Sequence, residues 1–137
     1  MRSTRAVRVV DACVVIEALT RGGPVCDQAL AVMSAGDVMA PELLDVEVLH
    51  ALRGLVRGGK FAPEEGRLAV RTIGEWPILR RPHLPLLPRI WELRDNLTAC
   101  DAAYVALAEA LRCPLVTSDA RLASAAGIRC EVQVLGT

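Results

Sequence analysis

Four acidic residues, spread over most of the chain, are the side chains best suited to hold a divalent cation. They are Asp11, Glu47, Asp101 and Asp119. Four carboxylates brought within a few ångströms repel by roughly 4 kcal/mol for each closest pair at an effective dielectric near 20. Such a cluster is neutralised either by raised pKa values or by bound cations. Because all-oxygen ligands select hard ions, we expect Mg²⁺ or Mn²⁺ rather than zinc.

Two of these acids directly follow predicted strands. Asp11 ends the β-branched run of residues 6–10, and Asp119 comes after the apolar segment 114–117. In a parallel α/β sheet, ligands bind beyond the carboxyl ends of the strands, so both acids are expected at the binding edge. Each acid also precedes a predicted helix, where aspartate is a common N-cap, and Ser118 competes with Asp119 for that position. The sequence leaves both roles open.

The other two acids lie on predicted helices. Glu47 falls at the border of the buried stripe of a helix over residues 41–57, and no arginine follows it at helical spacing. Asp101 extends the buried stripe that contains Tyr104 toward the start of its helix. A carboxylate in that position is costly unless something binds it. Thr98 and Asp101 also fit a capping box, so a structural role remains an alternative.

The elements that must position these acids alternate between strands and helices. Strands are expected at residues 6–10, 37–40, 114–117 and 128–135, and the proline-rich connection 77–88 can include another brief strand. Helices are expected at residues 13–19, 25–35, 41–57, 63–76, 86–96, 100–111 and 120–126, with Pro41 as a first helical residue and Gly36 as a C-cap. This alternation predicts a three-layer α/β/α sandwich with a mainly parallel central sheet, formed as a single domain by residues 1–137.

Composition excludes several classes of protein. The 137 residues are 53% hydrophobic but include only two Trp, one Tyr and one Phe, so a module that stacks bases on aromatic platforms is not expected. The five cysteines are odd in number and form neither a CxxC pair nor a zinc-finger spacing. The N-terminal apolar run is too short and too charged for a signal peptide or a membrane span. We therefore expect a cytoplasmic protein with reduced thiols and no membrane partner.

The net charge of zero hides an uneven distribution of charge. Residues 53–94 contain eight Arg and one Lys against four acids, whereas the segments on either side are both acidic. A basic middle suits the binding of a phosphate backbone, and the candidates for that role are Arg53, Arg57, Lys60 and Arg94. Arginine-rich helices that are merely solvated are a nearly equal alternative.

Four segments resemble the PIN-domain nucleases and, among these, the VapC-type toxins of bacterial toxin–antitoxin pairs. They are residues 9–12, 41–48, 96–109 and 114–122, and the resemblance extends over nearly the whole chain. The stretch Asp-Ala-Ala-Tyr-Val-Ala-Leu-Ala-Glu at residues 101–109 is the most specific part of it.

The resemblance implies that the four acids are the catalytic and metal-binding residues of a Mg²⁺- or Mn²⁺-dependent endoribonuclease. Asp11 and Asp101 would be the principal ligands, with Asp119 and Glu47 completing the site directly or through waters. Thr117 matches the family's hydroxyl before the last acid, and Ser118 is expected to support the site beside it. Cys13 departs from the family pattern, because many members have serine there. The family also implies an RNA substrate, a small cognate antitoxin and homodimerisation.

Three other interpretations remain as alternatives. A non-enzymatic, magnesium-binding receiver-like module would need a lysine near the last strand, but Lys60 lies in the middle of the chain. A haloacid-dehalogenase-like phosphatase would need an aspartate where Cys13 stands. A PIN domain that only binds RNA is disfavoured by the four acids. The P-loop-like segment 54–61 lacks the Ser or Thr that should follow Lys60.

Overall fold

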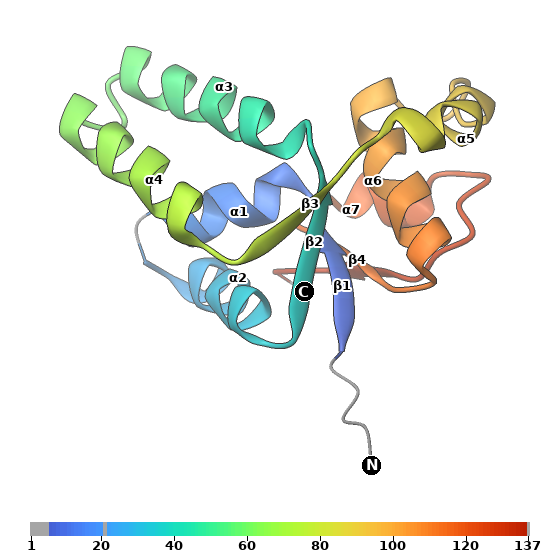
Figure 1. The fold of residues 1–137 in the computed structure, drawn as a ribbon. Helices are drawn as coiled ribbons and strands as arrows, with labels where there is room; N and C mark the ends of the chain where they lie inside the picture. The colour runs from blue at the N-terminus through green and yellow to red at the C-terminus, as the bar shows by residue number, and fades with distance from the viewer. Residues whose placement is uncertain (1–5, 21, 137) are drawn as a thin grey trace.

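The computed structural model describes residues 6–20 and 22–136, and it contains a five-stranded sheet in which every pairing is parallel (Figure 1). The strands are β1 (Val7–Val10), β2 (Asp37–Pro41), β3 (Ile78–Arg81), β4 (Leu115–Thr117) and β5 (Val132–Val134). The helices are α1 (Ala12–Leu19), α2 (Pro24–Ser34), α3 (Leu44–Arg57), α4 (Pro63–Glu75), α5 (Leu87–Glu92), α6 (Ala99–Leu111) and α7 (Ala120–Ser124), with a short 3₁₀ helix η1 (Leu84–Leu86). Helices α1 and α2 lie on one side of the sheet, and α5 and α6 lie on the other. The predicted three-layer α/β/α sandwich is confirmed.

The order of the strands places a switch point in the middle of the sheet. The order is β3-β2-β1-β4-β5, so the chain moves outward from β1 to β3 and then returns to the other side of β1. Val9 pairs with Met39 on β2 and with Leu115 on β4. Ligands of open α/β sheets bind where the strand order reverses. Here that place is at the carboxyl ends of β1 and β4. Asp11 follows the last residue of β1, and Thr117 is the last residue of β4.

Helix α6 passes through the core and brings its first turn to this edge. Its residues 102–108 are all buried, which explains a helix that is apolar on every side. It packs against β1 and β2, and also against α5. Because Asp101 precedes the buried segment directly, the packing of α6 fixes the height of this carboxylate above the sheet.

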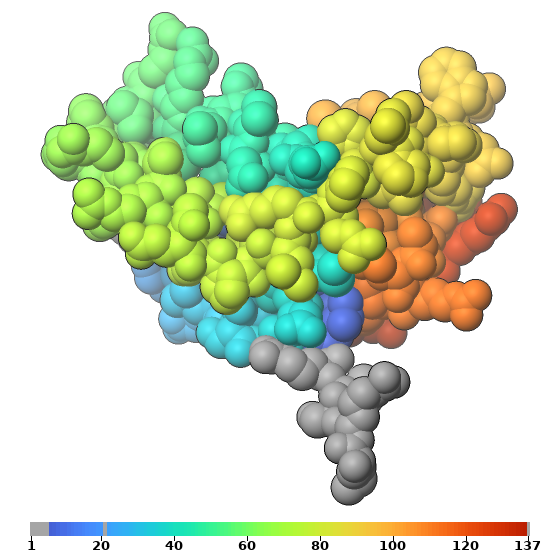
Figure 2. Space-filling view, viewed as in Figure 1, coloured from blue at the N-terminus to red at the C-terminus, as the bar shows by residue number. Residues whose placement is uncertain are grey.

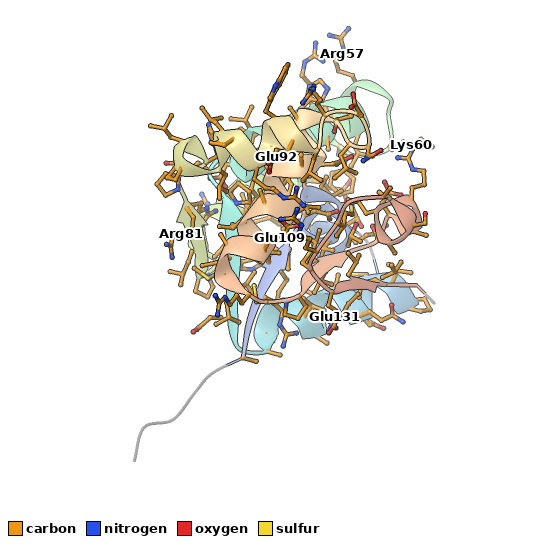
Figure 3. All side chains as sticks on the ribbon, turned by 90° about the vertical axis from the view of Figure 1, so that its right-hand side faces the viewer. Arg57, Lys60, Arg81, Glu92, Glu109 and Glu131 are labelled. Atoms are coloured by element: carbon orange, nitrogen blue, oxygen red, sulfur yellow. The ribbon has the colours of Figure 1, made fainter. Side chains whose placement is uncertain are left out.

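An ion pair between α5 and α6 holds this side of the molecule together. Arg89 donates from Nε to Glu109 Oε1 at 2.7 Å and from Nη2 to Glu109 Oε2 at 3.1 Å. Arg89 also reaches the Gly127 carbonyl at 2.7 Å, and the Arg129 N–H donates to Glu109 at 2.8 Å. Figure 3 shows Glu109 on α6 below Glu92, the other acid that pairs with Arg89. The pair therefore joins α5, α6 and the segment that leads to β5.

Helix α3 is anchored at the opposite side of the site. Its apolar residues Leu44, Val48 and Leu52 are buried, and Asp45 at its first turn accepts from Arg80 of β3 at 2.8 Å. Helices α3 and α4 form an arm beside α1 (Figure 1), and the surface is hollowed between α3 and α5 (Figure 2). Glu47 lies near the anchored end of this arm.

The prediction that Pro41 begins a helix is wrong. Pro41 is the last residue of β2, and α3 begins at Leu44. The Glu42 N–H donates to the Arg81 carbonyl on β3, so the position of the missing Pro41 N–H faces the other neighbour, β1. The pairing of β1 with β2 ends at Met39. Proline is tolerated because no partner for its N–H remains there.

Other elements are shorter than predicted. The helix expected at residues 86–96 covers only Leu87–Glu92, and the strand expected at 128–135 covers only Val132–Val134. The brief strand expected within 77–88 is present as β3. Gly36 follows the C-cap Ala35, with φ of 75°, and a side chain there would collide with the Ala6 carbonyl.

Among the described residues, no helix combines the length and the apolar character required to cross a membrane.

Candidate active site

Asp11 is held at the end of β1 by three hydrogen bonds. Its carboxylate is N-cap of α1, accepting from the Val14 N–H at 3.3 Å, and the residue is only 6% exposed. The Thr117 hydroxyl donates to Oδ2 at 2.5 Å, and the Cys13 thiol donates to Oδ1 at 2.6 Å. Burial raises the pKa of Asp11 despite these hydrogen bonds, and the nearby charge of Asp101 raises this pKa further. The residue is therefore a helix cap and a site carboxylate together.

The predicted supporting residues tie the ends of β1 and β4 together. Cys13 Sγ lies 3.5 Å from Thr117 Oγ1 and accepts from the Ser118 N–H at 3.3 Å. Thr117, which is fully buried, also accepts from the Asp119 N–H at 3.0 Å. Burial and the charge of Asp11 raise the pKa of Cys13 to about 11, so this side chain is a neutral thiol that can donate to the carboxylate. Cysteine thus does here what a serine hydroxyl would do.

Glu47 is half-buried and is held from the facing helix. The Tyr104 hydroxyl donates to Glu47 Oε1 at 2.6 Å. Burial raises the pKa of Glu47, the hydrogen bond from Tyr104 lowers it, and the charges of Asp101 and Asp11 raise it. A hydrogen bond from the exposed Cys100 also lowers the pKa of Glu47. Sequence reasoning placed Tyr104 in the core but missed the role of its hydroxyl; the available signal was its place on the same helix face, three residues after Asp101.

Asp101 lies in the first turn of α6, where a negative charge is favourable. The Thr98 hydroxyl caps the helix by accepting from the Asp101 N–H at 3.2 Å, which is one half of the predicted capping box. The other half, a hydrogen bond from the Thr98 N–H to the Asp101 carboxylate, does not form among the described residues. Within residues 6–20 and 22–136, no hydrogen bond or ion pair engages the Asp101 carboxylate. This carboxylate is thus available to an external ligand.

Asp119 is held by an arginine from its own helix. It is the N-cap of α7, accepting from the Arg121 N–H at 3.0 Å, so the alternative of Ser118 as the cap is wrong. The Arg121 guanidinium donates from Nε to Asp119 Oδ1 at 3.1 Å and from Nη2 to Oδ2 at 2.9 Å. These contacts hold the pKa of Asp119 below its usual value. Sequence reasoning missed Arg121, although its position two residues after the acid was a signal.

The structure brings the four acids to a single pocket, as predicted. This pocket, which we call the acid pocket, has a volume of about 270 Å³ and is lined by Asp11, Ala12, Cys13, Ile16, Glu47, Asp101, Tyr104 and Asp119. The first three acids along the chain influence one another electrostatically, whereas the last is paired with an arginine. In the part of the chain that is described, no three His, Cys, Asp or Glu side chains stand close enough to hold a metal ion. Protein groups hold three of the carboxylates instead: Thr117 and Cys13 donate to Asp11, Tyr104 donates to Glu47, and Arg121 donates to Asp119.

The four cations predicted to bind phosphate lie outside this pocket. Arg53, Arg57, Lys60 and Arg94 are all exposed. Figure 3 shows Arg57 and Lys60 at the periphery of the molecule. Arg57 is ten residues beyond Glu47 on α3, which corresponds to about 15 Å along the helix. The Arg94 guanidinium lies 4.6 Å from the ring centre of Trp91, next to α5. Helices α3 and α5 border the hollow seen in Figure 2.

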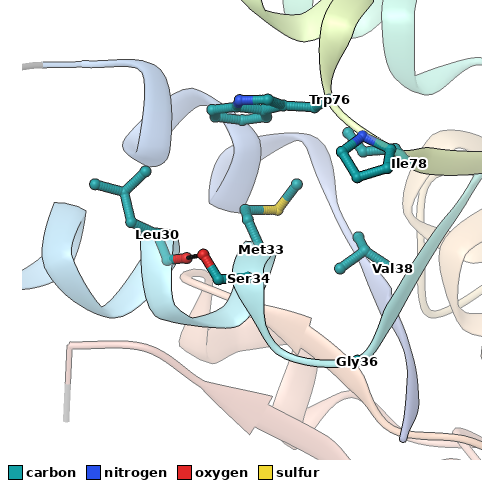
Figure 4. A pocket seen from close by; sticks show the side chains of 8 residues that line it. Leu30, Met33, Ser34, Gly36, Val38, Trp76 and Ile78 are labelled. Carbon is teal, nitrogen blue, oxygen red and sulfur yellow. Dashed lines mark hydrogen bonds between the residues drawn. The ribbon is translucent and has the colours of Figure 1, made fainter. Parts of the chain in front are cut away.

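A second, apolar hollow lies near the start of β2 rather than at its carboxyl end (Figure 4). It has a volume of about 310 Å³ and is lined by Leu30, Met33, Ser34, Gly36, Val38, Trp76, Pro77 and Ile78. Because no titratable side chain lines it, this hollow has no means of acid–base or metal chemistry. The acid pocket is the candidate active site.

Comparison with known families agrees with this geometry. Residues 8–128 match the family described as PIN domain. The chain belongs to the PIN-domain family. Among individual proteins, this PIN domain is 40% identical over 127 residues to Ribonuclease VapC9 of Mycobacterium tuberculosis, covering 93% of this chain and 97% of that protein. It is 41% identical over 128 residues to Ribonuclease VapC1 of the same species, covering 93% and 96%.

Solved structures share the fold of this PIN domain at much lower sequence identity. PAE2754 from Pyrobaculum aerophilum superposes with a TM-score of 0.68 at 21% identity, over 94% of this chain and 84% of that one. VapBC2 from Rickettsia felis, solved bound to a promoter DNA fragment, gives a TM-score of 0.66 at 10% identity, over 92% and 98%. These likenesses support the fold alone.

The donor set of this PIN domain fits a hard divalent cation. Its carboxylates offer only oxygen ligands, which is the set that Mg²⁺ and Mn²⁺ prefer. Burial raises the pKa of both Asp11 and Glu47, and the charge of Asp101 adds to each rise. Negative charge at this place is thus incompletely compensated by the protein, and a cation would compensate it.

Proposed function

We propose that this PIN domain is a metal-dependent endoribonuclease that hydrolyses RNA phosphodiester bonds, and that it is the toxin of a toxin–antitoxin pair. The observation that carries the proposal is the convergence of four carboxylates from both halves of the chain on one pocket. The VapC ribonucleases that cover nearly the whole chain at about 40% identity support the same reaction. The proposal takes residues 1–137 as one nuclease domain.

The residues have distinct parts in this reaction. Asp11 and Asp101 hold Mg²⁺ or Mn²⁺, and Glu47 and Asp119 complete the site directly or through waters. When bound, the ion activates a water and neutralises charge on the phosphate. Three residues around Asp11 keep its carboxylate in place: Thr117 and Cys13 donate to it, and the Ser118 N–H fixes the Cys13 sulfur.

The basic residues of the middle segment hold the substrate. Arg53, Arg57, Lys60 and Arg94 bind phosphates of the RNA that flank the cleavage position. Their exposure and the excess of cations over residues 53–94 support this assignment. Phosphate contacts of this kind position RNA without reading its sequence.

The protein partners are a cognate antitoxin and a second copy of the chain. The resemblance to VapC-type toxins implies the antitoxin, and the VapC relatives at about 40% identity support it. Large apolar side chains stay exposed on α3, η1 and α5, and these support a homodimer: Val46, Leu49, Leu84, Leu87 and Trp91. The free cysteines suit a cytoplasmic location.

Cleavage of a mixed single-stranded RNA pool tests the proposed activity. We expect new RNA ends with Mg²⁺ or Mn²⁺, none with excess chelator, and none from Asp11→Asn or Asp101→Asn. The matched control is Asp27→Asn, which changes an exposed acid of α2 outside the pocket and should cut normally. RNA binding without metal-dependent cleavage by the natural protein would overturn the nuclease and leave only an RNA-binding PIN domain.

A further inference from the structure

Arg121 is a cation at the edge of the acid pocket, where it contacts Asp119. The proposed reaction gives it no role so far. It forms three hydrogen bonds with Asp119, one from its backbone N–H and two from its guanidinium. It also lies within electrostatic range of Asp101. In the part of the chain that is described, Asp119 is the only one of the four acids that forms an ion pair.

The ion pair between Arg121 and Asp119 is exposed and weak, so another cation could replace the guanidinium. The Arg121 side chain is 90% exposed and that of Asp119 is 29% exposed. An exposed ion pair gains little because water competes for both partners and holding a long side chain costs entropy. A divalent cation drawn to Asp119 and Asp101 would compete with the guanidinium for the same carboxylate oxygens.

A third hollow, beside the acid pocket, is lined in part by Arg121. It has a volume of about 280 Å³ and shares Asp101 and Asp119 with the acid pocket; its other lining residues are Asn96, Leu97, Thr98, Arg121, Leu122 and Ala125. We call it the side pocket. Because Arg121 lines the side pocket, a guanidinium released from Asp119 would still be within reach of a group bound there. Its planar, two-pronged donor arrangement matches a phosphate as well as it matches a carboxylate.

We propose that Arg121 is an exchangeable cation of the site: it holds Asp119 in the metal-free protein, is released when a divalent ion takes that carboxylate, and then binds the RNA phosphate that enters the side pocket next to the cleavage position. This proposal rests on the proposed ribonuclease function and adds a positioning residue to it. Loss of the Arg121 charge should therefore act in opposite directions on the two ligands. Metal should bind more tightly, and RNA should bind more weakly.

The first experiment is a titration with Mn²⁺ in the absence of RNA, following free Mn²⁺ by electron paramagnetic resonance. Arg121→Gln should bind Mn²⁺ about 2- to 5-fold more tightly than the natural protein, which is the range expected for release from an exposed ion pair. Arg121→Lys keeps the charge but loses the two-pronged contact, so its Mn²⁺ affinity should lie between those of Arg121→Gln and the natural protein. The control Arg112→Asn removes the same charge at the far end of α6, at a left-handed position (φ 54°) that asparagine tolerates, and should change nothing.

The second experiment measures RNA cleavage by the same variants. Arg121→Gln should need a higher RNA concentration for half-maximal rate, and the log–log salt dependence of that concentration should weaken by about 0.7, the value for one lost phosphate contact on a single strand. A variant that was merely misfolded would lose affinity for both ligands. Weaker or unchanged Mn²⁺ binding, or an unchanged RNA requirement, overturns the role of Arg121.

The two proposals fail in different ways. If the natural protein cuts RNA with metal while Arg121→Gln matches it in Mn²⁺ and RNA binding, the ribonuclease function stands and the exchange falls. If the natural protein neither binds Mn²⁺ nor cuts RNA, both fall together.

Discussion

The Tyr104 hydroxyl donates a 2.6 Å hydrogen bond to Glu47 Oε1, and this contact joins α6 to α3 across the acid pocket. Asp101 lies on the same helix, three residues before Tyr104. The hydrogen bond therefore sets the position of one acid relative to another that belongs to a different helix. Tyr104 itself is 2% exposed, so its ring cannot move without disturbing the core.

Tyr104→Phe should keep the packing of the ring and release Glu47. We expect a loss of about 1 kcal/mol in the free energy of unfolding, the usual net value of one hydrogen bond. Because this hydrogen bond lowers the pKa of Glu47, its removal should raise that pKa and move the midpoint of Mn²⁺ binding to higher pH. Mn²⁺ titrations over a pH series would measure the shift. An unmoved midpoint would show that Tyr104 does not position Glu47.

Asp11→Asn should make the metal-free protein more stable while it abolishes cleavage. Burial raises the pKa of Asp11 in the folded protein, with Asp101 adding to the rise. A carboxyl group whose pKa is higher in the folded protein than in the unfolded chain lowers the free energy of unfolding at neutral pH. This destabilisation disappears as the pH falls below the pKa of the group in the unfolded chain. The gain in Tm should therefore be present at pH 7 and shrink on acidification. Mn²⁺ should raise the Tm of the natural protein but not of the variant. A lower Tm for metal-free Asp11→Asn at pH 7, with Asp27→Asn unchanged, would contradict this account.

Thr117→Val and Thr117→Ser should separate the hydroxyl of Thr117 from its bulk. Valine keeps the shape but removes the donor to Asp11 and the acceptor for the Asp119 N–H. Leaving a buried polar group without its partner costs about 1–3 kcal/mol. We expect valine to lose both stability and cleavage, and serine to keep most of the cleavage. Equal activity of the two variants would assign Thr117 to packing alone.

Glu109→Gln should destabilise the protein by about 2 kcal/mol, because it removes the charged partner of Arg89 where both side chains are largely buried. Arg89 then keeps only its longer ion pair with Glu92 and its hydrogen bond to the Gly127 carbonyl. Although burial raises the pKa of Glu109, hydrogen bonds from Arg89 and the Arg129 N–H lower it overall. This contribution is thus present above the pKa of an unfolded glutamate and is lost as the pH falls through the lower folded value.

Urea unfolding at neutral and acidic pH would measure this contribution. The difference between the natural protein and Glu109→Gln should shrink in acid. The control is Glu64→Gln, because its pair with Arg67 has both side chains 79% exposed and should contribute little at either pH. A loss as large in the control would contradict the assignment to burial.

Charge reversal on α3 should test the phosphate contacts along this helix. Arg53→Glu and Arg57→Glu should each weaken RNA binding and reduce its salt dependence, with the larger effect from Arg53, which lies nearer to Glu47 on the helix. Binding would be measured by the RNA concentration for half-maximal cleavage at several salt concentrations. Unchanged salt dependence in both variants would make these arginines solvated surface residues.

The sequence predicted the layers of the fold and the placement of Asp11 and Asp119 at one edge of the sheet, because both follow from local patterns. Glu47 and Asp101 lie on helices, and their arrival at the same edge depends on how α3 and α6 pack. An apolar run that ends in aspartate marks a strand end, and parallel strands bring such ends to one edge. Pro41 was misassigned for the same reason: its preference for the first turn of a helix is local, whereas the pairing that makes it a strand residue comes from β3. The partners of the acids, Tyr104 and Arg121, depend on side-chain contacts that spacing alone does not fix.

The order of the strands divides the site between the two halves of the chain. Asp11 and Glu47 come from the part that forms β1, β2 and α3, and Asp101 and Asp119 come from the part that forms α6, β4 and α7. A chain still being translated cannot complete the site until β4 has inserted beside β1. The acid pocket of the proposed nuclease is therefore incomplete during most of its own synthesis.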